Sequence, residues 1–264
     1  MKETRMKVHV GPHKGQEKPA MKDGKRKTLG ILGGMGPEAT AYFFELIIRL
    51  TAADEDQGHV PVIIRSDPRV PDRTKSILEG GPSPLLSLIE GARALMAAGA
   101  DFAVMPCVTA HFFLPELAAR VKIPFVSLLD ESLEFLRKEH PGVRKVGLVA
   151  TNGAVRSGIV RDAFARAGVE VLIPSEADQA RIMEAIYGPK GIKAGFTAGS
   201  PRRAALGVAR RLVREGAQAV MAGCTEIPLV LRAEDFDVPF VEPMLVGARA
   251  CVLRAGFRLR FPAR

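Results

Sequence analysis

The chain has 264 residues, 47% of them hydrophobic, so it can bury one large core or two smaller ones. It holds no apolar run of transmembrane length and no segment typical of a secretory signal. Its three cysteines lack Cys-x-x-Cys spacing, which argues against a disulfide framework and a structural zinc site. We expect a cytoplasmic protein with reduced thiols, no membrane contact and no bound metal.

The formal net charge of +9 is concentrated at the N-terminus. Residues 1–28 hold nine basic and three acidic side chains, which gives +6 and leaves +3 for the other 236 residues. Because the excess lies in a polar tail and not on a folded face, we do not predict a nucleic-acid partner. We expect residues 1–28 to form a basic, disordered extension.

Short apolar runs alternate with helical patterns along the first half of the chain. A buried strand enters a glycine-rich turn over residues 30–36, and Pro37 then suits the first turn of a helix. Gly99 is a typical helix stop, and a buried strand follows it at once. The further predictions are strands at 62–67 and 102–106 and helices at 39–50 and 85–98.

The second half of the chain repeats the first. Residues 147–153 match 30–36, and residues 220–224 match 103–107, both at an offset of 117. Two further segment pairs match after small insertions or deletions. Helices are predicted at 204–215 and 243–255, with a strand at 217–222. We therefore predict two homologous lobes, residues 29–140 and residues 141–264.

This alternation predicts an α/β fold in which each lobe has an open parallel sheet flanked by helices. We expect the lobes to be related by a pseudo-two-fold axis, with the site in the cleft between them. We also expect the C-terminal helix to pack on the first lobe. In such sheets the chemistry gathers beyond the carboxyl ends of the strands, where both glycine-rich turns and two of the cysteines fall.

Cys107 and Cys224 are equivalent in the repeat and both follow a predicted strand. Cys251 lies on a predicted helix and is best explained as a small buried hydrophobic residue. Two thiols facing one cleft suit proton transfer at a tetrahedral carbon, which needs a base on one face and an acid on the other. A thiol has a reference pKa near ~8.5, so it can serve in either form.

Other residues permit further interpretations. The sequence Gly34-Met35-Gly36-Pro37-Glu38-Ala39 fits a dinucleotide-binding turn, but Pro37 removes a backbone donor and the next strand ends some 30 residues later. Arg73 and Lys193 are cations that either bind a carboxylate or lie in solvent. His111 is a candidate base, or a residue that packs near the site.

Four motifs resemble the aspartate/glutamate racemase family, in order and over about residues 28–255. They are Leu32-Gly33-Gly34-Met35-Gly36-Pro37, Pro71-Asp72-Arg73-Thr74, Met105-Pro106-Cys107-Val108-Thr109-Ala110-His111 and Gly223-Cys224-Thr225-Glu226-Ile227-Pro228. The resemblance implies a two-lobed α/β fold, catalysis by Cys107 and Cys224 without a cofactor, an acidic amino acid as substrate, and a homodimer. The substrate-binding residues it implies are Met35, Gly36, Asp72, Arg73, Thr74, Val108, Thr109, Ala110, Asn152, Lys193 and Thr225.

Within this set, the resemblance assigns the side-chain carboxylate of the substrate to Arg73 and Lys193. It assigns the α-carboxylate to Thr109 and the turn around Asn152. The sequence departs from the family pattern at Val108, where an Asn is usual, and at Asp67 and Asn152. We therefore expect a racemase or epimerase of aspartate, glutamate or a close analogue. The alternatives are a dicarboxylate decarboxylase or isomerase on the same fold, and a non-catalytic amino-acid-binding protein.

Overall fold

The computed structural model describes residues 26–260, so nearly all of the predicted N-terminal tail lies outside the described residues. The strands are β1 (Leu29–Gly33), β2 (Val62–Ser66), β3 (Phe102–Val104), β4 (Phe125–Val126), β5 (Lys145–Val149), β6 (Glu170–Leu172), β7 (Ala219–Ala222) and β8 (Phe240–Val241). The helices are α1 (Pro37–Leu50), α2 (Arg73–Glu79), α3 (Leu85–Ala97), α4 (Leu114–Arg120), α5 (Leu128–Glu139), α6 (Asn152–Arg156), α7 (Ile159–Ala165), α8 (Glu176–Tyr187), α9 (Ser200–Arg214) and α10 (Pro243–Arg254).

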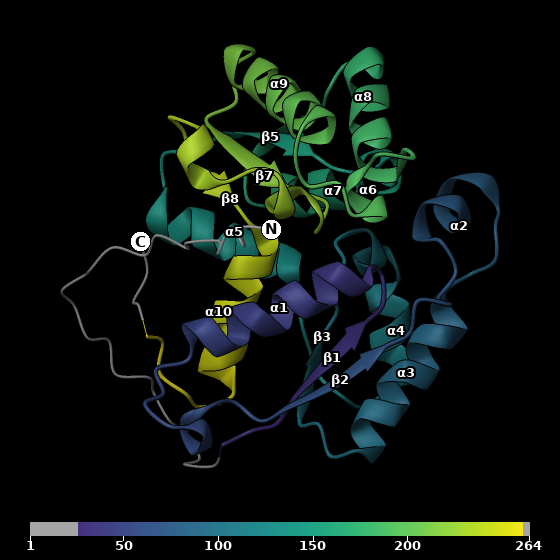
Figure 1. Cartoon of the computed structure of the whole chain (residues 1–264), viewed down its shortest axis with the longest axis vertical. Coiled ribbons are helices and arrows are strands. Elements are labelled where there is room, and N and C mark those ends of the chain that lie inside the picture. Colours follow the sequence, from purple (N-terminus) through teal and green to yellow (C-terminus); the bar gives the residue numbers. More distant parts are fainter. Residues whose placement is uncertain (1–25, 261–264) are drawn as a thin grey trace, which may run out of the picture.

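The strands form two four-stranded sheets with the same topology. The first has the order β2-β1-β3-β4 and the second the order β6-β5-β7-β8. Every pairing within these sheets is parallel. Helices flank both sheets, and the first sheet lies in the lower half of the molecule and the second in the upper half (Figure 1). The predicted α/β fold with two parallel sheets is confirmed, and the repeat in the sequence corresponds to a repeated strand order.

Proline accounts for two differences between the predicted and observed helices. Helix α1 begins at Pro37 and α9 at Ser200, earlier than the expected starts at residues 39 and 204. Each has proline in its first turn, where the missing N–H leaves no hydrogen bond unmade. The apolar faces that follow are buried in the core, as at Phe43 and Val208. No helix in the described part of the chain is long and apolar enough to span a membrane.

Helix α10 follows the second sheet along the chain but packs against α1 and α5. Its buried residues join one apolar cluster with Phe43 of α1 and Leu128 of α5. Beyond α10 the chain returns to the end of α1, where Leu259 forms an antiparallel bridge with Thr51. The last described residues therefore fasten the C-terminal part of the chain to the elements of the first sheet.

The glycine turn after β1 depends on Gly34. Its φ is +93°, and a Cβ there would collide with the backbone of Asp67. Gly99 has nearly the same φ, +94°, but no atom lies within 4 Å of the position of its absent Cβ. The two glycines share one backbone conformation and differ in their surroundings.

We predict that Gly34→Ala lowers the free energy of unfolding clearly more than Gly99→Ala does. The left-handed backbone costs an alanine about 1–2 kcal/mol at either site, and Gly34→Ala adds the collision with Asp67. Urea unfolding of both variants measures the difference. Equal losses would show that the chain beside Asp67 yields without cost.

Candidate active site

One pocket lies at the carboxyl ends of the central strands. Cys107 follows β3 and Cys224 follows β7, so equivalent strands of the two sheets deliver the two thiols. Both cysteines line the pocket and are buried, with exposed fractions of 6% and 5%. The space between the lining residues is about 270 Å³ including the open mouth.

Nine of the thirteen predicted site residues line this pocket: Met35, Arg73, Thr74, Cys107, Val108, Thr109, Lys193, Cys224 and Thr225. The other four are not among the lining residues. Asp72 caps α2 by accepting a hydrogen bond from the Lys75 backbone at 2.8 Å, and Ala110 is buried in the apolar core. Asn152 begins α6, and Gly36 precedes α1 without contributing a side chain.

Three further residues line the pocket that the sequence did not single out. Thr151 and Glu226 stand at the offset of 117 from Gly34 and Thr109. Thr151 lies within the repeated segment 147–153, and extending the second repeat by two positions would have included Glu226. Tyr187 ends α8, where nothing in its sequence surroundings distinguishes it. Its ring lies against Lys193, whose Nζ is 5.5 Å from the ring centre.

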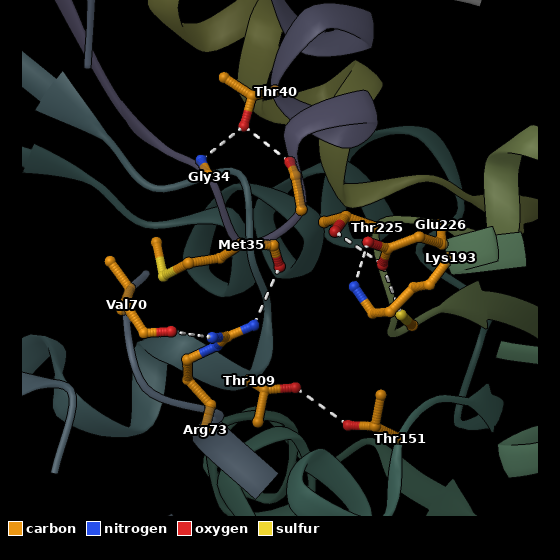
Figure 2. Close-up of polar contacts among 12 residues, drawn as sticks. Gly34, Met35, Thr40, Val70, Arg73, Thr109, Thr151, Lys193, Thr225 and Glu226 are labelled. Carbon is orange, nitrogen blue, oxygen red and sulfur yellow. Dashed lines mark hydrogen bonds and ion pairs between the residues drawn. The ribbon is translucent and has the colours of Figure 1, made fainter. Parts of the chain in front are cut away.

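Arg73 supplies a cation beside Cys107. Its guanidinium donates to the backbone carbonyls of Val70 at 3.1 Å and Met35 at 3.3 Å (Figure 2). A third bond, to the Pro71 carbonyl at 2.9 Å, completes the set that fixes its position. Its Nε is buried and has no hydrogen-bond partner among the described residues. Burial alone would lower the pKa of Arg73, but the neighbouring Cys107 and other acidic groups raise it overall. The side chain is therefore a permanent positive charge.

Cys224 belongs to a chain of three polar groups. Its Sγ donates to Glu226 Oε2 at 2.9 Å, and Glu226 Oε1 accepts from Lys193 Nζ at 2.5 Å. Burial and the Glu226 carboxylate raise the pKa of the Cys224 thiol well above its usual value, while Lys193 acts in the opposite direction. Burial also lowers the pKa of Lys193, but the pairing with Glu226 outweighs this and raises it. Cys224 is therefore a thiol and Lys193 an ammonium near neutral pH.

The two lobes meet at the pocket through hydroxyl groups and glycines. Thr109 Oγ1 and Thr151 Oγ1, which come from different lobes, are hydrogen-bonded at 3.0 Å (Figure 2). A Cβ on Gly153 would lie 2.7 Å from Thr74 Oγ1 and 2.9 Å from Thr109 Cγ2. A Cβ on Gly36 would lie 3.0 Å from Glu226 Oε1. Each glycine turn therefore sits directly against polar pocket residues of the other lobe.

The first glycine turn satisfies its own polar groups. Thr40 Oγ1 accepts from the Gly34 backbone N–H at 2.9 Å and donates to the Gly36 carbonyl at 2.8 Å (Figure 2). A pyrophosphate at this turn would have to compete with Thr40 for the Gly34 donor. This disfavours the dinucleotide interpretation of the sequence. Among residues 26–260, no cluster of three or more His, Cys, Asp or Glu side chains is placed to hold a metal.

His111 braces the loop that carries Cys107. Its Nε2 accepts from the Leu128 backbone at 3.0 Å, so Nδ1 carries the proton and donates to the Cys107 carbonyl at 2.9 Å. The ring is 3% exposed, and burial lowers its pKa. Both nitrogens are thus engaged with the backbone, and His111 is a structural residue behind the pocket.

We predict that the stabilising effect of His111 is lost as the pH falls. The folded protein holds this imidazole neutral, whereas the unfolded chain takes up a proton below about pH 6.5. The stability difference between the protein and His111→Gln should shrink by up to about 1.4 kcal/mol per pH unit between about pH 6.5 and 5. Urea unfolding across this range measures it, with His140→Gln as the control. A constant difference would contradict the neutral assignment.

Comparison with known proteins places this architecture in a family. The model of the family described as Asp/Glu/Hydantoin racemase matches residues 32–251. The chain therefore belongs to the Asp/Glu/hydantoin racemase family, which confirms the resemblance seen in its motifs.

The chain is similar to individual relatives over most of their length. The aspartate racemase of Picrophilus torridus is 31% identical with a TM-score of 0.78, over 89% of this chain and 96% of that one. An aspartate racemase homologue from Pyrococcus horikoshii OT3 is 25% identical with a TM-score of 0.69, over 87% and 99%. The broad specificity amino-acid racemase RacX of Bacillus subtilis (strain 168) is 24% identical over 230 residues, 85% of this chain and 96% of RacX.

Proposed function

We propose that the protein is a cofactor-independent amino-acid racemase or epimerase in which Cys107 and Cys224 are the two proton-transfer groups. One observation carries the proposal: two buried thiols line one pocket from equivalent positions of two homologous lobes. Membership of the Asp/Glu/hydantoin racemase family supports the reaction class. The three free thiols fit the reducing cytoplasm expected from composition.

The proposed reaction needs one thiolate and one thiol at a time. The thiolate takes the proton from Cα, and the thiol on the opposite face donates its own proton to the resulting carbanion. Negative charge spreads onto the α-carboxylate in the intermediate. Hydroxyl groups such as those of Thr109 and Thr225 line the pocket and can donate hydrogen bonds to this carboxylate. The protein ends each turnover with the thiolate and thiol exchanged between the two cysteines.

An acidic amino acid is the substrate we propose. Arg73 and Lys193 place two cations in the pocket, which suits a substrate with two carboxylates. The similarity to an aspartate racemase supports this choice, and the similarity to a broad-specificity racemase supports a wider range of amino acids. We further propose a homodimer, as the family resemblance implies.

We predict that both Cys107→Ala and Cys224→Ala abolish racemisation, because each direction of the reaction needs both thiols. Conversion of L-aspartate into D-aspartate and the reverse, followed by chiral chromatography, measures the loss. Exchange of the α-proton in deuterated water, followed by NMR, extends the assay of the unmodified protein to other amino acids. Cys251→Ala is the matched control, since Cys251 is a buried thiol of α10 outside the pocket. Tight binding of aspartate without exchange in the unmodified protein would instead identify a non-catalytic binding protein.

We predict that Val108→Asn raises kcat/KM for aspartate roughly ten- to a hundredfold. Val108 lines the pocket at 1% exposure, so an amide there would donate to a substrate carboxylate, a charged hydrogen bond worth about 1.5–3 kcal/mol. Val108→Leu has the same branching at Cγ as asparagine but no donor, so it controls for the change of shape. Similar kinetics for the two variants would show that this position does not contact the carboxylate.

A further inference from the structure

The two halves of the pocket share one plan, and among the paired positions at which they differ is one that bears a charge. Each glycine turn approaches the residue two positions after the cysteine of the other lobe: Gly153 approaches Thr109, and Gly36 approaches Glu226. Thr109 and Glu226 are related by the offset of 117. A neutral hydroxyl thus stands in one half where a carboxylate stands in the other.

The Glu226 carboxylate is almost fully buried, at 3% exposure. Its two oxygens have separate partners, since Oε2 accepts from Cys224 and Oε1 from Lys193. Thr225 Oγ1 adds a longer contact to Oε2 at 3.4 Å. Because a buried carboxylate must be compensated, Glu226 binds the thiol proton and the ammonium in one rigid arrangement.

Cys107 has a different environment. Its neighbouring cation, Arg73, is held by three backbone carbonyls and forms no ion pair with a carboxylate in the described structure. The hydroxyl of Thr109 is hydrogen-bonded to Thr151. The charged and titratable groups that act on Cys224 or share its pocket are Glu226, Lys193 and Tyr187 of its own lobe, with Cys107 and Arg73 of the other lobe.

We propose that Glu226 is a positioning residue that keeps the proton on Cys224 and Lys193 in place, so that Cys224 meets the substrate as the proton donor. In that step the S–H bond of Cys224 breaks, the electron pair stays on sulfur, and the proton forms the new Cα–H bond. In the reverse direction the Cys224 thiolate takes the Cα proton beside the Glu226 carboxylate. The catalytic part of this inference rests on the proposed function; the coupling of the three side chains does not.

The test is a thiolate titration of Cys224 in the full-length protein carrying Cys107→Ala and Cys251→Ala, so that one thiol remains. Ultraviolet absorbance reports the thiolate as the pH rises, with the further Cys224→Ala variant as the blank. We expect Glu226→Gln to lower the midpoint by about one unit or more, because it removes a neighbouring negative charge. Glu234→Gln, which removes an exposed carboxylate of the same lobe, should leave the midpoint unchanged.

A loosened pocket would also lower the midpoint, so a second variant separates the two causes. Lys193→Met removes the compensating cation and should raise the midpoint, whereas loosening would lower it in both variants. Opposite shifts support the inference; shifts of the same sign, or none with Glu226→Gln, overturn it. If the shifts are opposite but Cys107→Ala and Cys224→Ala still convert L-aspartate into D-aspartate, the proposed function fails and the coupling stands.

Discussion

The close approach of each glycine turn to the opposite lobe is the constraint on which the pocket depends. A Cβ on Gly153 would lie 3.0 Å from Thr74 Cα and 2.9 Å from Thr109 Cγ2, and one on Gly36 would lie 3.0 Å from Glu226 Oε1. A side chain at Gly153 would therefore require the facing lobe to shift, and one at Gly36 would require the Glu226 side chain to move. Backbone therefore forms part of the contact between the lobes, and polar side chains meet across it, as the hydrogen bond between Thr109 and Thr151 shows.

Apolar packing holds the lobes in this relation. One buried cluster runs from β1 and α1 of the first sheet through α5 and α10 to β5 and β7 of the second. Since α10 follows the second sheet but packs against α1, the end of the chain returns from the second lobe to the first. The polar groups at the pocket thus orient the two lobes, while the burial of apolar side chains away from the pocket stabilises their contact.

Much of this arrangement could be predicted from local sequence. Buried strands and helix-ending glycines are visible in short stretches of sequence, and the offset of 117 is visible when the two halves are compared. These signals predicted the fold and the equivalence of Cys107 and Cys224. The partners of those cysteines are less visible, because side chains far apart in the chain meet only when the lobes are assembled. Tyr187 belongs to the pocket for this reason. Glu226 belongs to the motif that contains Cys224, but its ion pair with Lys193 depends on the path of the loop that carries Lys193, which the sequence does not reveal.

The mismatch between Thr109 and Glu226 has a thermodynamic consequence for a racemase. Two enantiomers have equal free energies in solution, so the equilibrium constant between them is one whatever the protein does. The values of kcat/KM in the two directions must therefore be equal, even though the two acid–base groups have different surroundings. If Glu226 favours the protonated form of Cys224, the effect appears as a higher kcat in one direction. The KM in that same direction is then higher by the same factor. The protein can differ in how tightly it holds each mirror form, but not in how efficiently it interconverts them.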